Sequence, residues 1–353
     1  MATSSVSTLS LGTAMLSSMN RAQNQLTQLT SEASSGQYAD LGLQLGDQSG
    51  YELSLRDQTE FLNSLTTANN LTVTNLKTAQ SALDSIRTTA QSTVSTLTSL
   101  TAGSSSAAST LQNTGTNSLQ ELIGDTNTTA NGNYVFGGDN SSVAPMADYF
   151  SATTSAAKSA IDSAFQSTFG FLPTDPQAST ISASDMQSFL SGPFAALFSG
   201  SNWTSNWSSA SSTDVASQIA PGQFISTSTD ANQPGFQQLA EGYAMLTELG
   251  GASLSTGAQQ AVITAASSAI NQGVTSMTAT EAGLGTAQSS VTNATADMSN
   301  QLTILQTQLG SLDNVNANQI ATQLNSLQTQ LETAYQLTDQ LQKLSLAQYL
   351  PIS

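Results

Sequence analysis

The sequence feature that most constrains the fold is an apolar repeat, in steps of three and four residues, between Leu55 and Leu100. This spacing puts the apolar side chains on one face of an α-helix. At a rise of about 1.5 Å per residue, an uninterrupted helix of this length would extend roughly 70 Å. Such an element is a rod rather than the wall of an active-site pocket. We expect its core side to contain Leu55, Leu62, Leu65, Leu76, Leu83, Ile86 and Leu97.

Weaker repeats of the same kind occupy both ends of the chain. The N-terminal repeat has Gly12, Gln23 and Thr30 at core positions. Burial of a leucine contributes only about 1.5 to 3 kcal/mol, whereas ordering the backbone costs roughly 1 to 2 kcal/mol per residue. We therefore expect these arms to order only where neighbouring subunits cover them. Their assembly seams are predicted at Leu9, Leu16, Met19, Leu26 and Leu29, and at Leu324, Leu327, Leu331, Leu341, Leu344, Tyr349 and Leu350.

The composition of the sequence changes between residues 139 and 234, where both tryptophans and most prolines and phenylalanines fall among Ser, Thr and Gly. This composition is typical of a mixed or β-containing domain. The predicted fold is mainly α, a long antiparallel helical bundle or coiled coil of the N- and C-terminal segments with this smaller domain inserted. The predicted domains are terminal arms at 1–36 and 307–353, a rod at 37–138 and 235–306, and an outer domain at 139–234.

Two glycine-rich stretches interrupt the helical tracts. In SSGQYADLGLQLGDQSG, the alternation of Leu41, Leu43 and Leu45 predicts an extended strand. In ANGNYVFGGDN, the Asn-Gly pair favours a tight hairpin turn because both residues accept positive φ. Neither the GxGxxG nor the GK[ST] spacing is present, which argues against a phosphate-binding loop. We predict a domain-exit turn, with two aromatic residues on one face of a short strand, formed by Asn131, Gly132, Tyr134, Phe136, Gly137 and Gly138.

The charge balance excludes several classes of function. There are 6 Lys and Arg against 23 Asp and Glu, for a formal net charge of -17, and neither Cys nor His is present. Without a basic face the chain does not neutralise phosphates, so we expect no nucleic-acid or membrane partner. Without thiol and imidazole groups it lacks common metal ligands, nucleophiles and bases. We expect no catalytic residues, no metal site and no cofactor.

Two further patterns, the lysines and the apolar segments, also predict neither a catalytic site nor a targeting segment. We expect neither Lys158 nor Lys343 to replace histidine as the base of an SxxK arrangement. The N-terminal stretch has no basic segment followed by a long apolar one, and no later segment approaches about 18 uninterrupted apolar residues. Neither a cleavable signal nor a membrane span is therefore expected.

The pattern as a whole resembles the flagellin superfamily, with helical arms at both ends, a polar middle insertion, few charges and no Cys. The stretch NGNYVFGG is similar to that family's exit into its outer domain. SSGQYADLGLQLGDQSG, the terminal KLSLAQYLPIS and the middle segment from Trp203 to Ala240 resemble the family's hook-associated branch, of the alphaproteobacterial type, more than flagellin itself.

This resemblance implies an extracellular structural protein of the bacterial flagellum, exported unfolded through the type III apparatus and assembled as a ring of its own copies between hook and filament. It implies contacts with flagellin, with the other hook-filament junction protein and with an export chaperone near the C-terminal arm. Two alternatives stay open. One is a filament-forming flagellin, and the other is a secreted carbohydrate-binding module in which Trp203, Trp207 and Phe224 stack on sugar rings.

Overall fold

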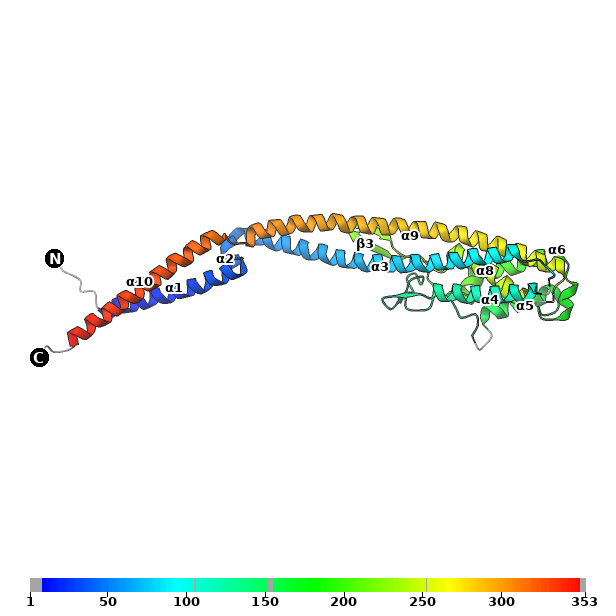
Figure 1. Cartoon of the computed structure of the whole chain (residues 1–353), viewed down its shortest axis with the longest axis horizontal. Helices are drawn as coiled ribbons and strands as arrows, with labels where there is room; N and C mark the ends of the chain where they lie inside the picture. The colour runs from blue at the N-terminus through cyan, green and yellow to red at the C-terminus, as the bar shows by residue number, and fades with distance from the viewer. Residues whose placement is uncertain (1–7, 105, 152–154, 252, 350–353) are drawn as a thin grey trace. The chain divides into compact units, whose positions relative to one another are not determined.

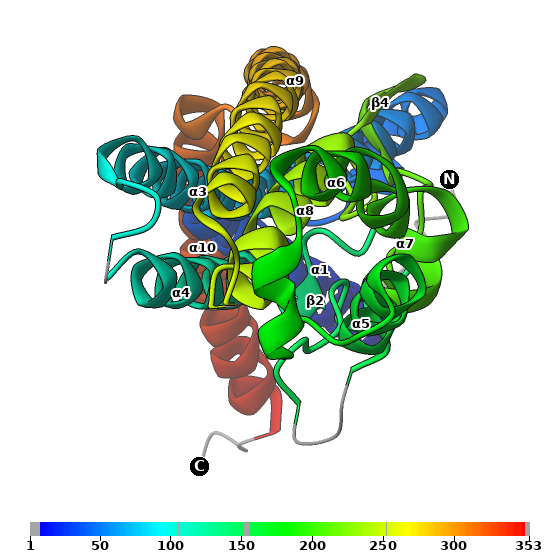
Figure 2. The ribbon, with the colours of Figure 1, turned by 90° about the vertical axis from the view of Figure 1, so that its right-hand side faces the viewer.

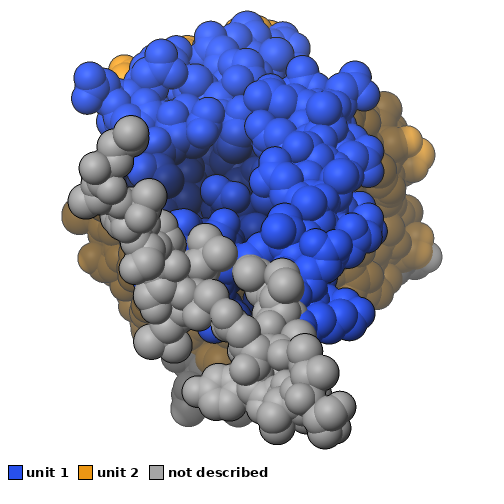
Figure 3. All heavy atoms as spheres, turned by 90° about the vertical axis from the view of Figure 1, so that its left-hand side faces the viewer, with its two compact units in different colours: residues 1–63, 300–353 blue, residues 64–299 orange. Residues whose placement is uncertain are grey.

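The computed structural model describes residues 8–104, 106–151, 155–251 and 253–349, without the side chains of 8, 9, 11, 341, 342 and 344–349. The long helices are α1 (Thr8–Ser35), α3 (Ser49–Ser99), α4 (Ala107–Thr126), α8 (Pro234–Leu249), α9 (Thr256–Asp313) and α10 (Ala317–Tyr349) (Figure 1). The chain divides into two compact units, unit 1 with residues 1–63 and 300–353 and unit 2 with residues 64–299 (Figure 3).

Unit 1 is built around the antiparallel pair α1 and α10 (Figure 1). At one end of the pair, Val315 N donates to Gly36 O at 2.9 Å. Further along, Gln23 Nε2 donates to Tyr335 Oη at 3.0 Å. Residues with lower numbers in α1 contact residues with higher numbers in α10. The two arms therefore run in opposite directions, as the repeats predict.

A short helix, α2 (Leu41–Leu45), occupies the stretch for which the leucine alternation predicts a strand. That prediction is wrong. Asp40 has extended backbone dihedrals, and its carboxylate accepts a hydrogen bond from Leu43 N at 2.9 Å, which caps the first turn. Leu43 is 82% exposed, so no partner surface selects the extended form. Gly46, with φ of 51°, ends the helix before the 3₁₀ turn η1 (Gly46–Gln48).

Unit 2 is a helical bundle in which α3 runs antiparallel to α9. Asn69 Nδ2 donates to Thr295 Oγ1 at 3.0 Å, and Arg87 Nε donates to Glu281 at 3.3 Å. Helix α4 packs closely on α8 at Gly115, where a Cβ atom would lie 2.5 Å from Leu246 Cβ. All seven residues of the predicted rod core are buried, at 0 to 8% exposure, the first two in unit 1 and the other five in unit 2: Leu55, Leu62, Leu65, Leu76, Leu83, Ile86 and Leu97.

The inserted segment of unit 2 is mixed, as predicted. Its elements are α5 (Ala156–Phe169), η2 (Pro176–Thr180), α6 (Ala183–Phe189), the π-helical turn η3 (Leu190–Phe194), η4 (Ala195–Phe198), α7 (Gly200–Asn206) and the antiparallel strands β3 (Ala216–Ala220) and β4 (Gln223–Ser226). In the end-on view, α5, α6 and α7 gather on the side of α8 away from α3 (Figure 2). The predicted fold class is therefore confirmed. The finer division into arms, rod and outer domain stays a prediction, since the structure groups 64–299 as one unit.

Candidate assembly surface

Helix α1 buries almost nothing apolar. Among its described side chains, only Glu32 is buried, at 5% exposure. Leu16 is 56% exposed, and Met19, Leu26 and Leu29 are only partly buried. The remaining residue of the predicted N-terminal seam, Leu9, has a side chain outside those described. This chain therefore covers the predicted assembly face only in part, and Leu16 is its one exposed residue among the described seam side chains.

Helix α10 is better packed at its beginning than further on. Leu327 and Leu331 are buried at 7% exposure each, and Leu324 is partly buried. Tyr335 is 50% exposed and Leu337 is 45% exposed. Three other predicted C-terminal seam residues, Leu341, Leu344 and Tyr349, have side chains outside those described. The last one, Leu350, lies wholly outside the described residues.

Exposed apolar side chains are concentrated in unit 1. Of the thirteen large apolar side chains exposed among the described residues, eight belong to this smaller unit. They are Leu16, Leu43, Tyr51, Leu53, Phe61, Ile304, Tyr335 and Leu337. A groove of about 300 Å³ also lies between α1 and α10, lined by Met15, Ala334 and Leu337 among others. A surface of this kind marks an interaction site in a soluble protein.

Ionic contacts in unit 1 fix the junction between the arms and the long helices. Arg56 pairs with Glu52 and, at 2.5 Å, with Asp313 at the end of α9. The hydrogen bond that Arg56 Nε donates to the carboxylate of Glu52 raises the pKa of Arg56 above its ordinary value. Tyr38 N donates to Asp313 O at 3.0 Å, which ties the loop after α1 to the same point. These contacts brace the base of the arms but leave their apolar faces open.

The predicted hairpin turn is present at the exit from α4. Strands β1 (Thr129–Ala130) and β2 (Asn133–Tyr134) pair antiparallel, and Asn131 and Gly132 between them have φ of 52° and 83°. The strand is shorter than predicted, because Phe136 lies beyond it and is fully buried, with its ring 5.2 Å from that of Phe236.

Backbone amides in this stretch are engaged within the protein. Tyr134 N donates to Ser141 O at 2.8 Å, and Asp139 N donates to Thr213 O at 3.1 Å. Gly138 has φ of 60°, and a Cβ atom there would lie 2.2 Å from Ser211 O. The geometry is that of a packed turn rather than a phosphate cradle, whereas its role as a domain exit stays a prediction.

The tryptophans do not form a sugar-binding platform. Trp203 and Trp207 are 0% and 2% exposed and stack on each other with centroids 5.9 Å apart. Tyr149 covers the other side of Trp207 at 5.2 Å, and Trp203 Nε1 donates to Asn232 at 3.0 Å. Only Phe224, at 63% exposure, is available to solvent. The carbohydrate-binding alternative therefore loses its two indole rings to the core.

Ser155 and Lys158 do have the SxxK spacing in the sequence. Both groups have structural partners. Ser155 Oγ accepts a hydrogen bond from Lys158 N at 3.1 Å and caps α5, while Lys158 Nζ pairs with Glu248. Tyr149 Oη also donates to Glu248, at 2.8 Å, and burial raises the pKa of Tyr149 well above its usual value. The lysine is thus held in a partly buried ion pair.

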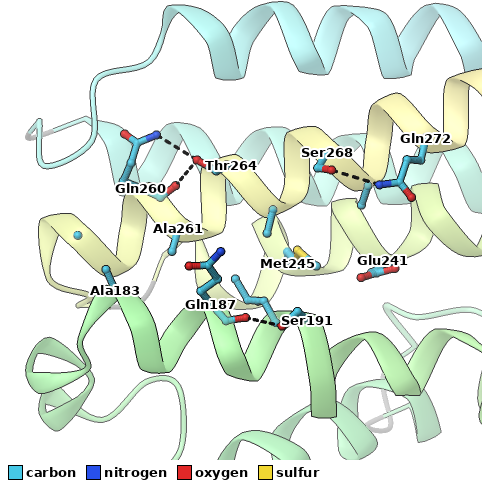
Figure 4. A pocket seen from close by; sticks show the side chains of 14 residues that line it. Ala183, Gln187, Ser191, Glu241, Met245, Gln260, Ala261, Thr264, Ser268 and Gln272 are labelled. Carbon is cyan, nitrogen blue, oxygen red and sulfur yellow. Dashed lines mark hydrogen bonds between the residues drawn. The ribbon is translucent and has the colours of Figure 1, made fainter.

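A groove of about 530 Å³ in unit 2, between α6, α8 and α9, was not predicted from the sequence. The carboxylate of Glu241 lies in it beside Met245 (Figure 4). Burial raises the pKa of Glu241 to about 7. The signal in the sequence is slight, a single acid within the otherwise mostly apolar stretch from Leu239 to Leu246.

No helix in the described parts of the chain combines the length and apolarity needed to cross a membrane. Within the same residues, no three acidic side chains gather where they could hold a metal ion.

Comparison with known proteins agrees with the helical arms. Residues 6–141 match the family model of the bacterial flagellin N-terminal helical region, and residues 267–350 match that of the bacterial flagellin C-terminal helical region. No curated protein matches the chain significantly. A solved structure assigned as a flagellar hook-associated protein of Vibrio parahaemolyticus is similar, with a TM-score of 0.50 and 11% sequence identity, over 75% of this chain and 97% of that one. At this identity the similarity shows a shared fold.

Proposed function

Because this chain belongs to the flagellin superfamily, we propose that it is the structural subunit that joins the hook to the flagellin filament. Membership of the superfamily makes the chain a structural component of the bacterial flagellum, outside the cell. The proposal adds its place in that structure and the surface by which it is held there.

The observation that carries the proposal is the unburied apolar face of α1. A helix of 28 residues in water gains most of its stability from packing an amphipathic face. In α1 no apolar side chain among those described is buried, so this packing is incomplete within one chain. Neighbouring subunits that cover Leu16, Met19 and the groove beside α10 would supply it, and stability would then depend on the subunits engaged.

Two features favour the junction over the filament. The terminal sequence KLSLAQYLPIS resembles the ending of the hook-associated branch of the superfamily, and the structurally similar Vibrio parahaemolyticus protein is assigned as hook-associated. On this proposal the partners are further copies in a ring, flagellin on one side, the other junction protein on the other side, and an export chaperone at the C-terminal arm. The role is structural rather than enzymatic.

Deletion of the gene tests the junction role. We expect cells with intact hooks, no attached filaments and flagellin released into the medium, and motility that returns when the gene is supplied in trans. Filaments that stay attached to the hooks of the deletion strain would contradict the proposal.

The alternative within the same superfamily is a filament-forming flagellin. The two are distinguished by the purified chain alone. A filament flagellin polymerises without other proteins into long tubes that electron microscopy detects, whereas a junction subunit forms at most short assemblies limited to a few copies.

A further inference from the structure

The groove around Glu241 contains a carboxylate that nothing in the described chain satisfies. The neighbouring polar side chains have partners on their own helices: Gln260 donates to Thr264, and Gln272 donates to Ser268 at 3.2 Å (Figure 4). Ser191 Oγ donates to Gln187 O at 2.9 Å. No hydrogen bond or ion pair reaches Glu241 from these described residues, and the groove lining contains no other titratable group.

The shape of the groove suits a side chain presented by another molecule. Its α9 wall has a row of small residues spaced four apart, Gly257, Ala261, Ala265 and Ala269, with the polar residues Gln260, Thr264, Ser268 and Gln272 beside it. The floor, with Leu190 and Met245, is apolar and suits an alkyl stem. A long side chain that ends in a cation would match both the floor and the carboxylate.

The positively charged side chains that form no ion pair within the chain are the candidates to supply this cation from a second copy. Four of the six cations pair within the chain: Arg56 with Glu52 and Asp313, Arg87 with Asp84 and Glu281, Lys158 with Glu248, and Lys343 with Asp339. Among the described residues this leaves Arg21 and Lys77 without an ion pair. Arg21 lies on α1, the helix that the proposed function already assigns to the seam between arms, whereas Lys77 is exposed on α3 in unit 2, outside that seam.

We propose that Lys77 of one copy inserts into the groove of the next and pairs with Glu241, so that unit 2 contributes a specific contact between subunits. This inference rests on the proposed structural role. Pairs between Lys77 and exposed acids would be screened by solvent and salt and would contribute little. The carboxylate of Glu241 is already desolvated in the groove and lacks a partner. An ion pair there would therefore stabilise the contact more than an ion pair with an exposed acid.

The contact has a defined geometry. Helices α3 and α6 lie on either side of α9 in the end-on view (Figure 2), so one copy can present α3 to the groove of another. Along the bundle, Gln80 lies beside Gly285 and Gly242 lies beside Ile270. With a rise of about 1.5 Å per residue, Lys77 and Glu241 of one copy are roughly 30 Å apart along the axis. Neighbouring copies are therefore displaced by about that distance, which is a heterologous, head-to-tail type of contact.

Zero-length carbodiimide cross-linking of isolated flagella, followed by mass spectrometry, tests this contact in the full chain. Carbodiimide joins a lysine amine to a carboxylate that it contacts, with loss of water. We expect a Lys77–Glu241 amide in assembled flagella and not in dilute monomer, and the axial separation within one copy means that this amide forms between copies. The Lys158–Glu248 pair, present in each chain, is an internal positive control.

The variant Glu241→Gln removes the cross-link and lowers the affinity between subunits roughly tenfold, whereas the matched control Asp297→Asn, which neutralises an exposed acid of α9, does neither. If flagella that contain the chain give the Lys158–Glu248 amide but no Lys77–Glu241 amide, the contact proposed here is wrong and the proposed function is unaffected. If the chain is absent from the flagella, both the contact and the proposed function are wrong.

Discussion

Replacement of Glu241 by Gln should stabilise the monomer. The pKa of Glu241 is about 7 in the folded unit and 4.5 in its ordinary state. A difference of about 2.5 in pKa corresponds to about 3 kcal/mol at 1.36 kcal/mol per pKa unit. Between pH 4.5 and 7 the folded unit binds the proton more tightly than the unfolded chain, so the free energy of unfolding falls as the pH rises through this window. Above it, the ionised carboxylate destabilises the folded unit by the full amount.

Glutamine has a similar shape and no charge, so Glu241→Gln should unfold with about 3 kcal/mol more free energy than the natural chain at pH 8 and less than about 1 kcal/mol more at pH 5. Urea unfolding followed by tryptophan fluorescence measures this in unit 2, because Trp203 and Trp207 are both buried there. The control Asp297→Asn changes an exposed acid of α9 and should shift the unfolding free energy by less than about 0.5 kcal/mol at either pH. A variant that gains no stability at pH 8, or gains equally at both pH values, would refute the reasoning.

Three further changes test other parts of the structure. Lys158→Met leaves the largely buried carboxylate of Glu248 without its partly exposed cation and should lower the unfolding free energy by about 1 to 2 kcal/mol in urea titrations. Gly138→Ala combines positive φ with a clash and should lower the free energy of unfolding by at least about 2 kcal/mol. Gly132→Ala has positive φ but no neighbouring atom in the way, so it should lower the same free energy by only about 1 kcal/mol. Equal thermal unfolding temperatures of the two variants would contradict this. Leu16→Ala, at a 56% exposed position, should leave monomer stability within about 0.5 kcal/mol but reduce incorporation into flagella, measured by immunoblot of sheared appendages.

The buried face of the long helices was determined by the sequence itself. A repeat in steps of three and four permits only one apolar face on an α-helix, so the buried positions from Leu55 to Leu97 follow from their spacing alone. The hairpin at Asn131 and Gly132 is equally local, because few residue pairs accept two successive positive φ values. Antiparallel packing of the two arms follows from helices at both ends of one chain that each carry an apolar stripe.

Only the tertiary structure decided the features that depend on distant residues. The alternation of Leu41, Leu43 and Leu45 is compatible with a strand, but no strand of the described residues pairs with this stretch, and the carboxylate of Asp40 caps a helix instead. Aromatic residues in a Ser- and Thr-rich segment do not reveal whether they face solvent, and only the folded structure shows that Trp203 is buried and stacked on Trp207. The pKa of Glu241 likewise depends on the elements that pack around α8, because desolvation is a property of the whole surroundings and leaves no mark on the spacing of residues along the chain.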